Sequence, residues 1–138
     1  MPLRLSLKPN EKVVIGNAVI ENGPKSTSFL IHNKATILRE KDILTEETAN
    51  TPAKRIYFIV QLMYLTGSME ESKEQHPVFF NLTKQFLAAC PTPEVFEVIS
   101  DVGELILNDN FYAALKRCKE LIKYEKEILE GGGPEPGP

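Results

Sequence analysis

Two cations and a hydroxyl alternate with leucines at the start of the chain. Arg4, Ser6 and Lys8 occupy the even positions, and the odd positions between Leu3 and Leu7 are all leucine. In a β-strand this alternation puts the polar residues on one face and the leucines on the other. Cations in such a row can meet phosphates, while a serine and exposed backbone groups can hydrogen-bond base edges of single-stranded RNA. The same charges would also protect a strand edge from aggregation, so both interpretations stay open.

Other reactive residue types lie in patterns that carry no known chemistry. The sequence has no dinucleotide- or phosphate-binding glycine motif, no HExxH and no GxSxG. His32 and His76 are isolated, and Cys90 and Cys118 are far apart with no CxxC, so we expect two reduced thiols. The carboxylates near Glu70 form a charge run typical of a solvated loop. The sequence therefore predicts no enzyme, no metal site and no cofactor.

The elements that must position Arg4, Ser6 and Lys8 are short strands. The expected strands cover residues 3–8, 12–16, 18–21, 26–32 and 36–39. Pro9-Asn10 and Asn22-Gly23-Pro24 are turn signals between them. Such close spacing predicts a small antiparallel sheet or barrel. A unit of about 45 residues rarely buries enough surface alone, so it needs covering helices or a second chain.

Helical periodicity replaces the alternation after residue 50. Thr51-Pro52 and Thr92-Pro93 each combine an N-cap side chain with a proline at the first helical position, and Gly67 can end the first helix. We expect helices over 52–66, between 70 and 89, over 93–107 and from 111 to about 130. The predicted fold is α+β: a five-stranded antiparallel β unit over 1–44, a bundle of about four helices over 45–130, and a flexible tail over 131–138.

The apolar residues of these helices predict which faces are buried. The expected core residues are Ile56, Ile59, Val60, Met63 and Tyr64 in the first helix, Val95, Phe96, Ile99, Val102 and Ile106 in the third, and the stripe Phe111, Leu115, Cys118, Ile122 and Leu129 in the last. Glu125 lies on that last stripe, where it either reaches solvent or pairs with a cation. The first helix is apolar nearly all round, so it is either sandwiched in the fold or offers one face to another protein.

The N-terminal and C-terminal halves of the chain differ in net charge. The 138 residues are 42% hydrophobic and carry a net charge of −3, yet residues 1–55 hold nine bases and six acids. A basic half beside an acidic half suits one nucleic-acid partner and one protein partner. No apolar run approaches the roughly 20 residues of a membrane span, and the start lacks the plan of a signal peptide, so we expect a cytoplasmic protein with no membrane contact.

Several segments together resemble the FlbT family of flagellar-biosynthesis regulators. They are LSLKPNEKVVIGNAVIENG, ILREKDIL, TPAKRIYFIVQLMYL and, at the last helix, NDNFYAALKRCKELIKYEKEIL. The resemblance covers nearly the whole chain apart from the acidic loop and the Gly/Pro tail. It implies post-transcriptional control of flagellin synthesis, through binding to the leader of flagellin mRNA, with an effect on its translation or stability. It also implies the flagellar regulator FlaF as a partner.

The N-terminal part alone is similar to the carbon storage regulators, which are RNA-binding proteins, at LSLKPNEKVVIG and LREKDI. That likeness implies a homodimer through the β unit and RNA contacts by Leu5, Leu7, Lys8 and Arg39. Where that family has two adjacent arginines, this chain has Leu7 and Lys8, so one cation is lost. With the alternating row, the candidate RNA-binding residues are Arg4, Leu5, Ser6, Leu7, Lys8 and Arg39. The competing hypothesis is a protein-binding adaptor or chaperone in flagellar assembly with no direct RNA contact.

Overall fold

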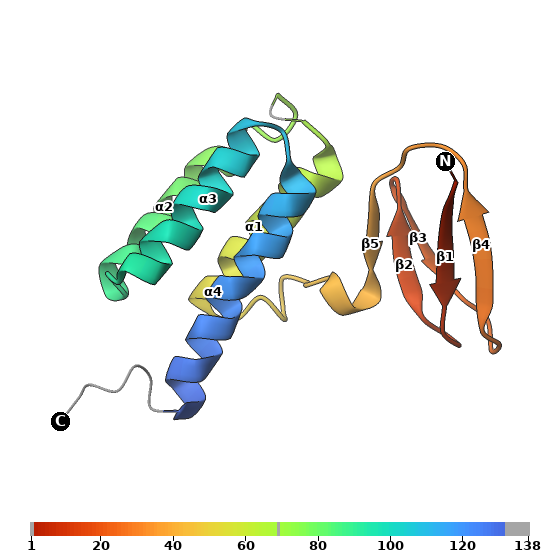
Figure 1. Cartoon of the computed structure of the whole chain (residues 1–138), viewed down its shortest axis with the longest axis horizontal. Coiled ribbons are helices and arrows are strands. Elements are labelled where there is room, and N and C mark those ends of the chain that lie inside the picture. The colour runs from red at the N-terminus through yellow and green to blue at the C-terminus, as the bar shows by residue number, and fades with distance from the viewer. Residues whose placement is uncertain (1, 69, 132–138) are drawn as a thin grey trace. The chain divides into compact units, whose positions relative to one another are not determined.

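The computed structural model describes residues 2–68 and 70–131 and confirms the α+β class (Figure 1). The chain divides into two compact units, Met1–Ile43 and Leu44–Pro138. Five antiparallel strands make up the first unit and four helices the second. Of the expected tail, Gly131 ends the last helix, and residues 132–138 lie outside the described residues.

The strands of the β unit pair in two separate ladders. Their bounds are β1 Leu3–Leu7, β2 Lys12–Ile15, β3 Ala18–Glu21, β4 Thr27–Ile31 and β5 Ile37–Arg39, followed by the 3₁₀ turn η1 Glu40–Asp42. β1 pairs with β4, and β2 pairs on one side with β3 and on the other with β5. Sequence reasoning expected one sheet or barrel. Asn10, at a φ of 61°, lies in the turn between β1 and β2, and β1 pairs with β4 rather than with β2.

A small apolar core joins the two ladders. The alternation predicted for β1 holds, since Leu5 and Leu7 are 5% and 3% exposed while Arg4 and Ser6 are exposed. Val13 of β2 completes the buried cluster. Partly buried side chains from β2, β4 and β5 pack against this cluster: Ile15, Phe29, Ile31 and Ile37. The core therefore takes residues from both ladders, and it is the surface opposite Leu5 and Leu7 that stays open.

The helices begin and end where the sequence predicts. They are α1 Pro52–Thr66, α2 Gln75–Ala89, α3 Pro93–Leu107 and α4 Phe111–Gly131. The side chain of Thr51 accepts a hydrogen bond from the N–H of Lys54, the third residue of α1, and that of Thr92 from the N–H of Val95, the third residue of α3. Gly67 ends α1 at a φ of 101°, and its N–H donates to the Met63 carbonyl over 3.0 Å. Local cap chemistry thus accounts for both ends of α1 and for the start of α3.

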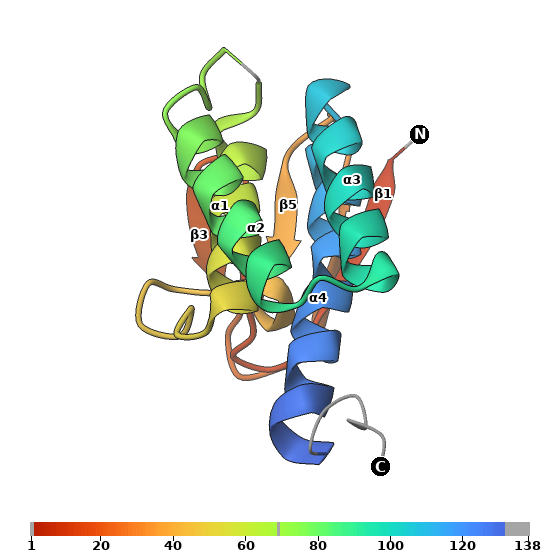
Figure 2. The same cartoon turned by 90° about the vertical axis from the view of Figure 1, so that its left-hand side faces the viewer.

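α1 lies between two other helices of its unit. It packs against α2 and α4, and α3 packs along α4, whereas α2 and α3 touch each other little (Figure 2). Fully buried side chains from α1, α3 and α4 fill the space between these helices: Ile56, Val60, Met63, Val95, Val102, Leu115, Cys118 and Leu121. Burial raises the pKa of the Cys118 thiol to about 12.

Two of the burial predictions, those for Phe96 and Leu129, are wrong. Phe96 is 58% exposed, and Val98 takes its place in the core of α3. The face of α3 toward α4 follows Val95, Val98, Val102 and Ile106, and Phe96 lies about 100° away from that row. In α4 the buried row passes through Ala114 and Leu121, so Leu129 is 70% exposed. Ile59, Tyr64, Ile99 and Ile122 are only half-buried.

The carboxylate of Glu125 caps another helix, a role that the sequence did not predict. Its Oε2 accepts a hydrogen bond from the Ala53 N–H over 3.0 Å, at the N-terminus of α1. A helix leaves its first N–H groups without intrahelical partners, and a carboxylate there also meets the positive end of the helix dipole. Pro52 has no N–H and Thr51 accepts from Lys54, so Glu125 completes the cap of α1 from another helix.

Candidate nucleic-acid interface

The outward face of the β1–β4 ladder carries the predicted polar row. Arg4 pairs in register with Leu30, and Ser6 pairs with Ser28. Because opposed residues of an antiparallel pair share a face, these four side chains point the same way, away from Leu5 and Leu7. All four are exposed, and Arg4 Nη1 lies 3.4 Å from Ser28 Oγ. The ladder therefore presents a cation, two hydroxyls and one apolar side chain together.

A shallow hollow of about 540 Å³ lies next to this face. Lys8 and Arg39 both line it, although they come from opposite ends of the unit's sequence. The remaining lining is mainly hydroxyl-bearing: Ser6, Ser26, Thr27 and Ser28, with Leu7 at its wall. Arg4 does not line the hollow itself, but its guanidinium contacts Ser28, which does. The structure thus gathers Arg4, Ser6, Lys8 and Arg39 on one open surface, which we call the β-unit polar hollow.

Arg39 is held in place by the turn that follows β1. Its Nη2 donates to the Ser6 carbonyl. Its Nε donates to Glu11 Oε2 over 3.3 Å, and its Nη2 donates to Glu11 Oε1 over 3.2 Å. This two-pronged pair is the geometry that a guanidinium and a carboxylate prefer. The side chains remain 33% and 14% exposed. The main role of the Arg39 side chain is therefore to connect β5 to β1 and to the turn after β1. Only the part of the guanidinium that makes none of these bonds is open to the hollow.

Glu11 is the anchor of that link. The Lys8 N–H donates to Glu11 Oε1 over 2.8 Å, and this bond does most to hold the pKa of Glu11 below its ordinary value of 4.5. Partial loss of solvent acts in the opposite direction, and the Arg39 guanidinium lowers the pKa further. Glu11 is consequently ionised at neutral pH and offsets part of the Arg39 charge. Of the three cations predicted to contact RNA, Lys8 and Arg4 are therefore the two whose charge Glu11 does not engage in an ion pair.

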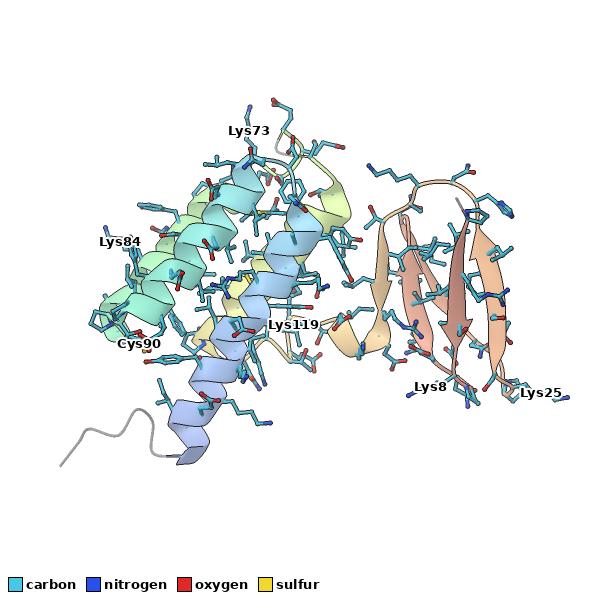
Figure 3. The ribbon with its side chains drawn as sticks, in the orientation of Figure 1. Lys8, Lys25, Lys73, Lys84, Cys90 and Lys119 are labelled. Carbon is cyan, nitrogen blue, oxygen red and sulfur yellow. The ribbon has the colours of Figure 1, made fainter. Side chains whose placement is uncertain are left out.

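Lys25 is a cation that sequence reasoning missed. The Asn22 Nδ2 group donates to the carbonyls of both Lys8 and Lys25, at 2.7 and 2.9 Å, so the two lysine backbones lie side by side. Figure 3 shows both lysines at the same end of the β unit. The signal was present in Asn22-Gly23-Pro24, which predicted a turn. Nothing local, however, indicates that this turn brings Lys25 to Lys8.

The other candidates occupy different positions around the hollow. The Leu5 and Leu7 side chains belong to the core, so these two residues can offer a ligand little beyond their main chain. The hydroxyls of Ser26, Thr27 and Ser28 were not singled out from sequence, although their run on an expected strand opposite Ser6 was visible. The hollow is therefore richer in hydroxyls and poorer in free arginine than the sequence predicted.

The described parts of the chain lack two other kinds of site. Within residues 2–68 and 70–131, no three His, Cys, Asp or Glu side chains gather closely enough to hold a metal ion. In the same residues, no helix combines the length and apolar character needed to cross a membrane. Fold and surface together define a two-unit α+β protein with an exposed basic, hydroxyl-lined hollow on its β unit.

Comparison with known sequences gives the family. The sequence model described as "Flagellar protein FlbT" matches residues 3–129. This chain belongs to the FlbT family, which confirms the resemblance drawn from the sequence.

The relatives include proteins named for an effect on the flagellum. A "Probable flagellum biosynthesis repressor protein FlbT" of Rhodopseudomonas palustris strain TIE-1 is 46% identical over 129 residues, covering 94% of this chain and 98% of the relative. Another protein of that name, from Caulobacter sp. strain K31, is 39% identical, with 94% and 97% covered. The "Flagellum biosynthesis repressor protein FlbT" of Caulobacter vibrioides strain ATCC 19089 is 37% identical, with 94% and 90% covered. No solved structure matches the chain.

Proposed function

We propose that this chain regulates flagellar gene expression by binding the leader of a flagellin mRNA and altering its translation or stability. Membership of the FlbT family and relatives named flagellum biosynthesis repressors support the regulatory role. A family of regulators also favours a binding function over catalysis. The β-unit polar hollow is the surface on which we expect the RNA to lie.

One observation carries the RNA proposal: Arg4 and Lys8 lie on an open face together with serine hydroxyls and one exposed leucine. Neither side chain forms an ion pair with any residue in the described ranges, and Lys25 lies beside Lys8. Unpaired cations bind phosphates, and hydroxyls beside them can donate to and accept from base edges or 2′-OH groups. A single-stranded loop suits this shallow surface because its bases are free to be contacted.

A salt titration of flagellin-leader RNA against the full-length chain tests the proposal. We expect the logarithm of the association constant to fall linearly with the logarithm of salt concentration, and each lost phosphate contact to reduce the slope by about 0.7. Arg4→Gln and Lys8→Gln should each weaken binding and reduce the slope. Lys84→Gln removes an equal charge from the exposed face of α2 and should leave both values unchanged (Figure 3).

Arg39 needs a separate design because it also holds the unit together. Arg39→Ala removes the bonds to Glu11 and the Ser6 carbonyl, so lost RNA binding alone would not distinguish contact from unfolding. Glu11→Gln weakens the same link but removes a negative charge beside the hollow. If RNA binds there, Glu11→Gln should bind more tightly or unchanged in a folded chain, while Arg39→Ala binds less.

The competing function, an adaptor in flagellar assembly, predicts a different outcome. A folded chain that shows no salt-dependent binding to the leader at low salt would sink the RNA proposal. The same result would favour protein contacts through the helical unit. Binding that Arg4→Gln, Lys8→Gln and Lys84→Gln weaken equally would place the RNA on some other surface.

A further inference from the structure

Two neighbouring hollows with mainly apolar walls lie on the helical unit and share lining residues. The first, of about 200 Å³, is walled by α1, α2 and the end of α4, and includes Phe86, Cys90 and Leu129. The second, of about 290 Å³, is walled by α1, α2 and the segment before α1, and includes Phe58 and Val78. Arg55 and Leu82 line both hollows. We call these two hollows together the α1/α2 groove.

One face of α2 forms a wall along the whole groove. Val78, Leu82, Gln85 and Ala89 follow each other at steps of four, three and four residues, and each lines one of the hollows. They lie on one side of the helix and span about 16 Å at 1.5 Å per residue. Val78 and Leu129 are 42% and 70% exposed. A groove of this length and character fits the apolar face of a helix of about three turns.

Arg55 sets the charge that an occupant needs. It is the one cation among the residues lining the two hollows, and it forms no ion pair with any residue that the structure describes. Glu46 and Glu125 line the groove without pairing with it, and Glu125 instead caps α1. Arg55 lies close to the N-terminus of α1, where the helix dipole disfavours a cation. It therefore contributes nothing to its own helix, and an incoming carboxylate would meet both the guanidinium and the dipole.

We propose that the α1/α2 groove docks an amphipathic helix of a partner protein, which buries apolar side chains in the two hollows and places a Glu or Asp against Arg55. This interaction lies on the other unit from the polar hollow and does not depend on RNA binding. Charge complementarity at Arg55 distinguishes such a partner from a helix that is only apolar. Shape and charge together define a motif with apolar residues at steps of four and three and one central acid.

The chain carries its own reporter for this groove. Cys90 lines the first hollow, is half-buried and is a free thiol (Figure 3). Cys118 is buried, and burial raises its pKa to about 12, so almost none of it is thiolate at pH 8. Alkylation by N-ethylmaleimide should therefore modify Cys90 first. A helix lying in the groove should slow that reaction.

The test uses two synthetic helices that differ at one position. Each has fourteen residues and leucines at steps of four and three, and the central position of the apolar face is Glu in one and Lys in the other. With the full-length chain we expect the Glu peptide to protect Cys90 and to bind about ten-fold more tightly than the Lys peptide. Arg55→Glu should reverse this preference. That variant puts an acid near the N-terminus of α1, so its helix should fold at least as well.

Lys84→Glu is the matched control, because it makes the same change of charge on α2 at a residue that lines neither hollow. It should keep the wild-type preference. Equal protection by both peptides, no protection by either, or a preference that Arg55→Glu leaves unchanged would each overturn the proposal. Protection of Cys90 that increases with the concentration of the chain alone would also overturn it, since the occupant would then be a second copy.

Discussion

The β unit and the helical unit keep their shapes by different means. The β unit buries a small cluster around Leu5, Leu7 and Val13, and Leu38 besides, and its turns are fixed by side chains that bond to the main chain. The helical unit buries rows of apolar residues along α1, α3 and α4. In the β unit the residues that form the candidate binding surface are thus the neighbours of those that hold the fold. In the helical unit most residues that line the groove lie outside the core, although Phe86 is 5% exposed, so the exposed ones can change with less structural cost.

The two units also offer different chemistry to partners. The β unit presents cations and hydroxyls on a shallow surface, whereas the helical unit presents an apolar groove with a single cation. Binding to the first should be strongly salt-dependent, and binding to the second should depend mainly on buried apolar area. The changes below test this contrast.

The largest effect should come from the helical core. Leu115→Ala removes a side chain that is 2% exposed, and we expect the free energy of unfolding to fall by about 2–5 kcal/mol. Urea unfolding followed by circular dichroism at 222 nm measures it. Leu107→Ala, at a position that is 71% exposed in α3, is the control and should cost far less. Equal losses in the two variants would contradict the helical core described above.

Asn22 should matter most in the β unit. Asn22→Asp keeps the side chain's shape but removes the donors to the exposed Lys8 and Lys25 carbonyls, and losing such hydrogen bonds costs about 0.5–1.5 kcal/mol each. Hydrogen exchange of the β1 and β4 amides, measured by NMR, should speed up. Asn17→Asp makes the same change at an exposed turn and should have little effect. Unchanged exchange in Asn22→Asp would mean that the turn is held by other contacts.

The cap of α1 should have a smaller effect. Thr51→Ala removes the acceptor of the Lys54 N–H and should lower the free energy of unfolding by about 1 kcal/mol. Thr51→Ser retains the acceptor and should recover most of that loss. Thermal unfolding of both variants gives the comparison. If Thr51→Ser is as unstable as Thr51→Ala, the methyl group rather than the hydrogen bond is responsible.

The smallest effect should be the pH dependence of Glu11. Its pKa is lower in the folded chain than the ordinary 4.5, so its contribution to stability is present above about pH 4.5 and disappears as the pH falls through the folded value. NMR titration of the Glu11 carboxyl carbon should give a midpoint below 4.5. Glu11→Gln should remove this part of the acid sensitivity, whereas Glu21→Gln on exposed β3 should not. A Glu11 midpoint at or above 4.5 would contradict the link to Lys8 and Arg39.

The sequence predicted the elements well because their signals are local. Alternation around Leu5 and Leu7, the Thr51-Pro52 and Thr92-Pro93 caps and the glycine at 67 each depend on residues within one turn or one strand. The burial of individual side chains was predicted less well. Phe96 and Val98 differ by two positions on a helix with apolar residues on several faces, and periodicity alone does not say which face meets α4.

Side chains that bond to distant main chain could not be predicted from sequence. Gln61 is 3% exposed because its amide pairs with both the N–H and the carbonyl of Leu44, at 2.9 and 2.8 Å. Glu125 caps a helix that begins more than seventy residues earlier. In both cases a polar residue is buried because it satisfies backbone groups, and the sequence around it gives no sign of that partner.

The sequence by itself determined where strands and helices form and that Arg4, Ser6 and Lys8 share one face, because these follow from local periodicity and capping. Only the tertiary structure decided that the main chains of Lys8 and Lys25 lie side by side and that Glu11 engages Arg39. It also decided that Arg55, in the α1/α2 groove, forms no ion pair with any residue that the structure describes. The reason is that these contacts depend on how strands pair and helices pack, and the energy that fixes that packing comes from side chains far apart in the chain.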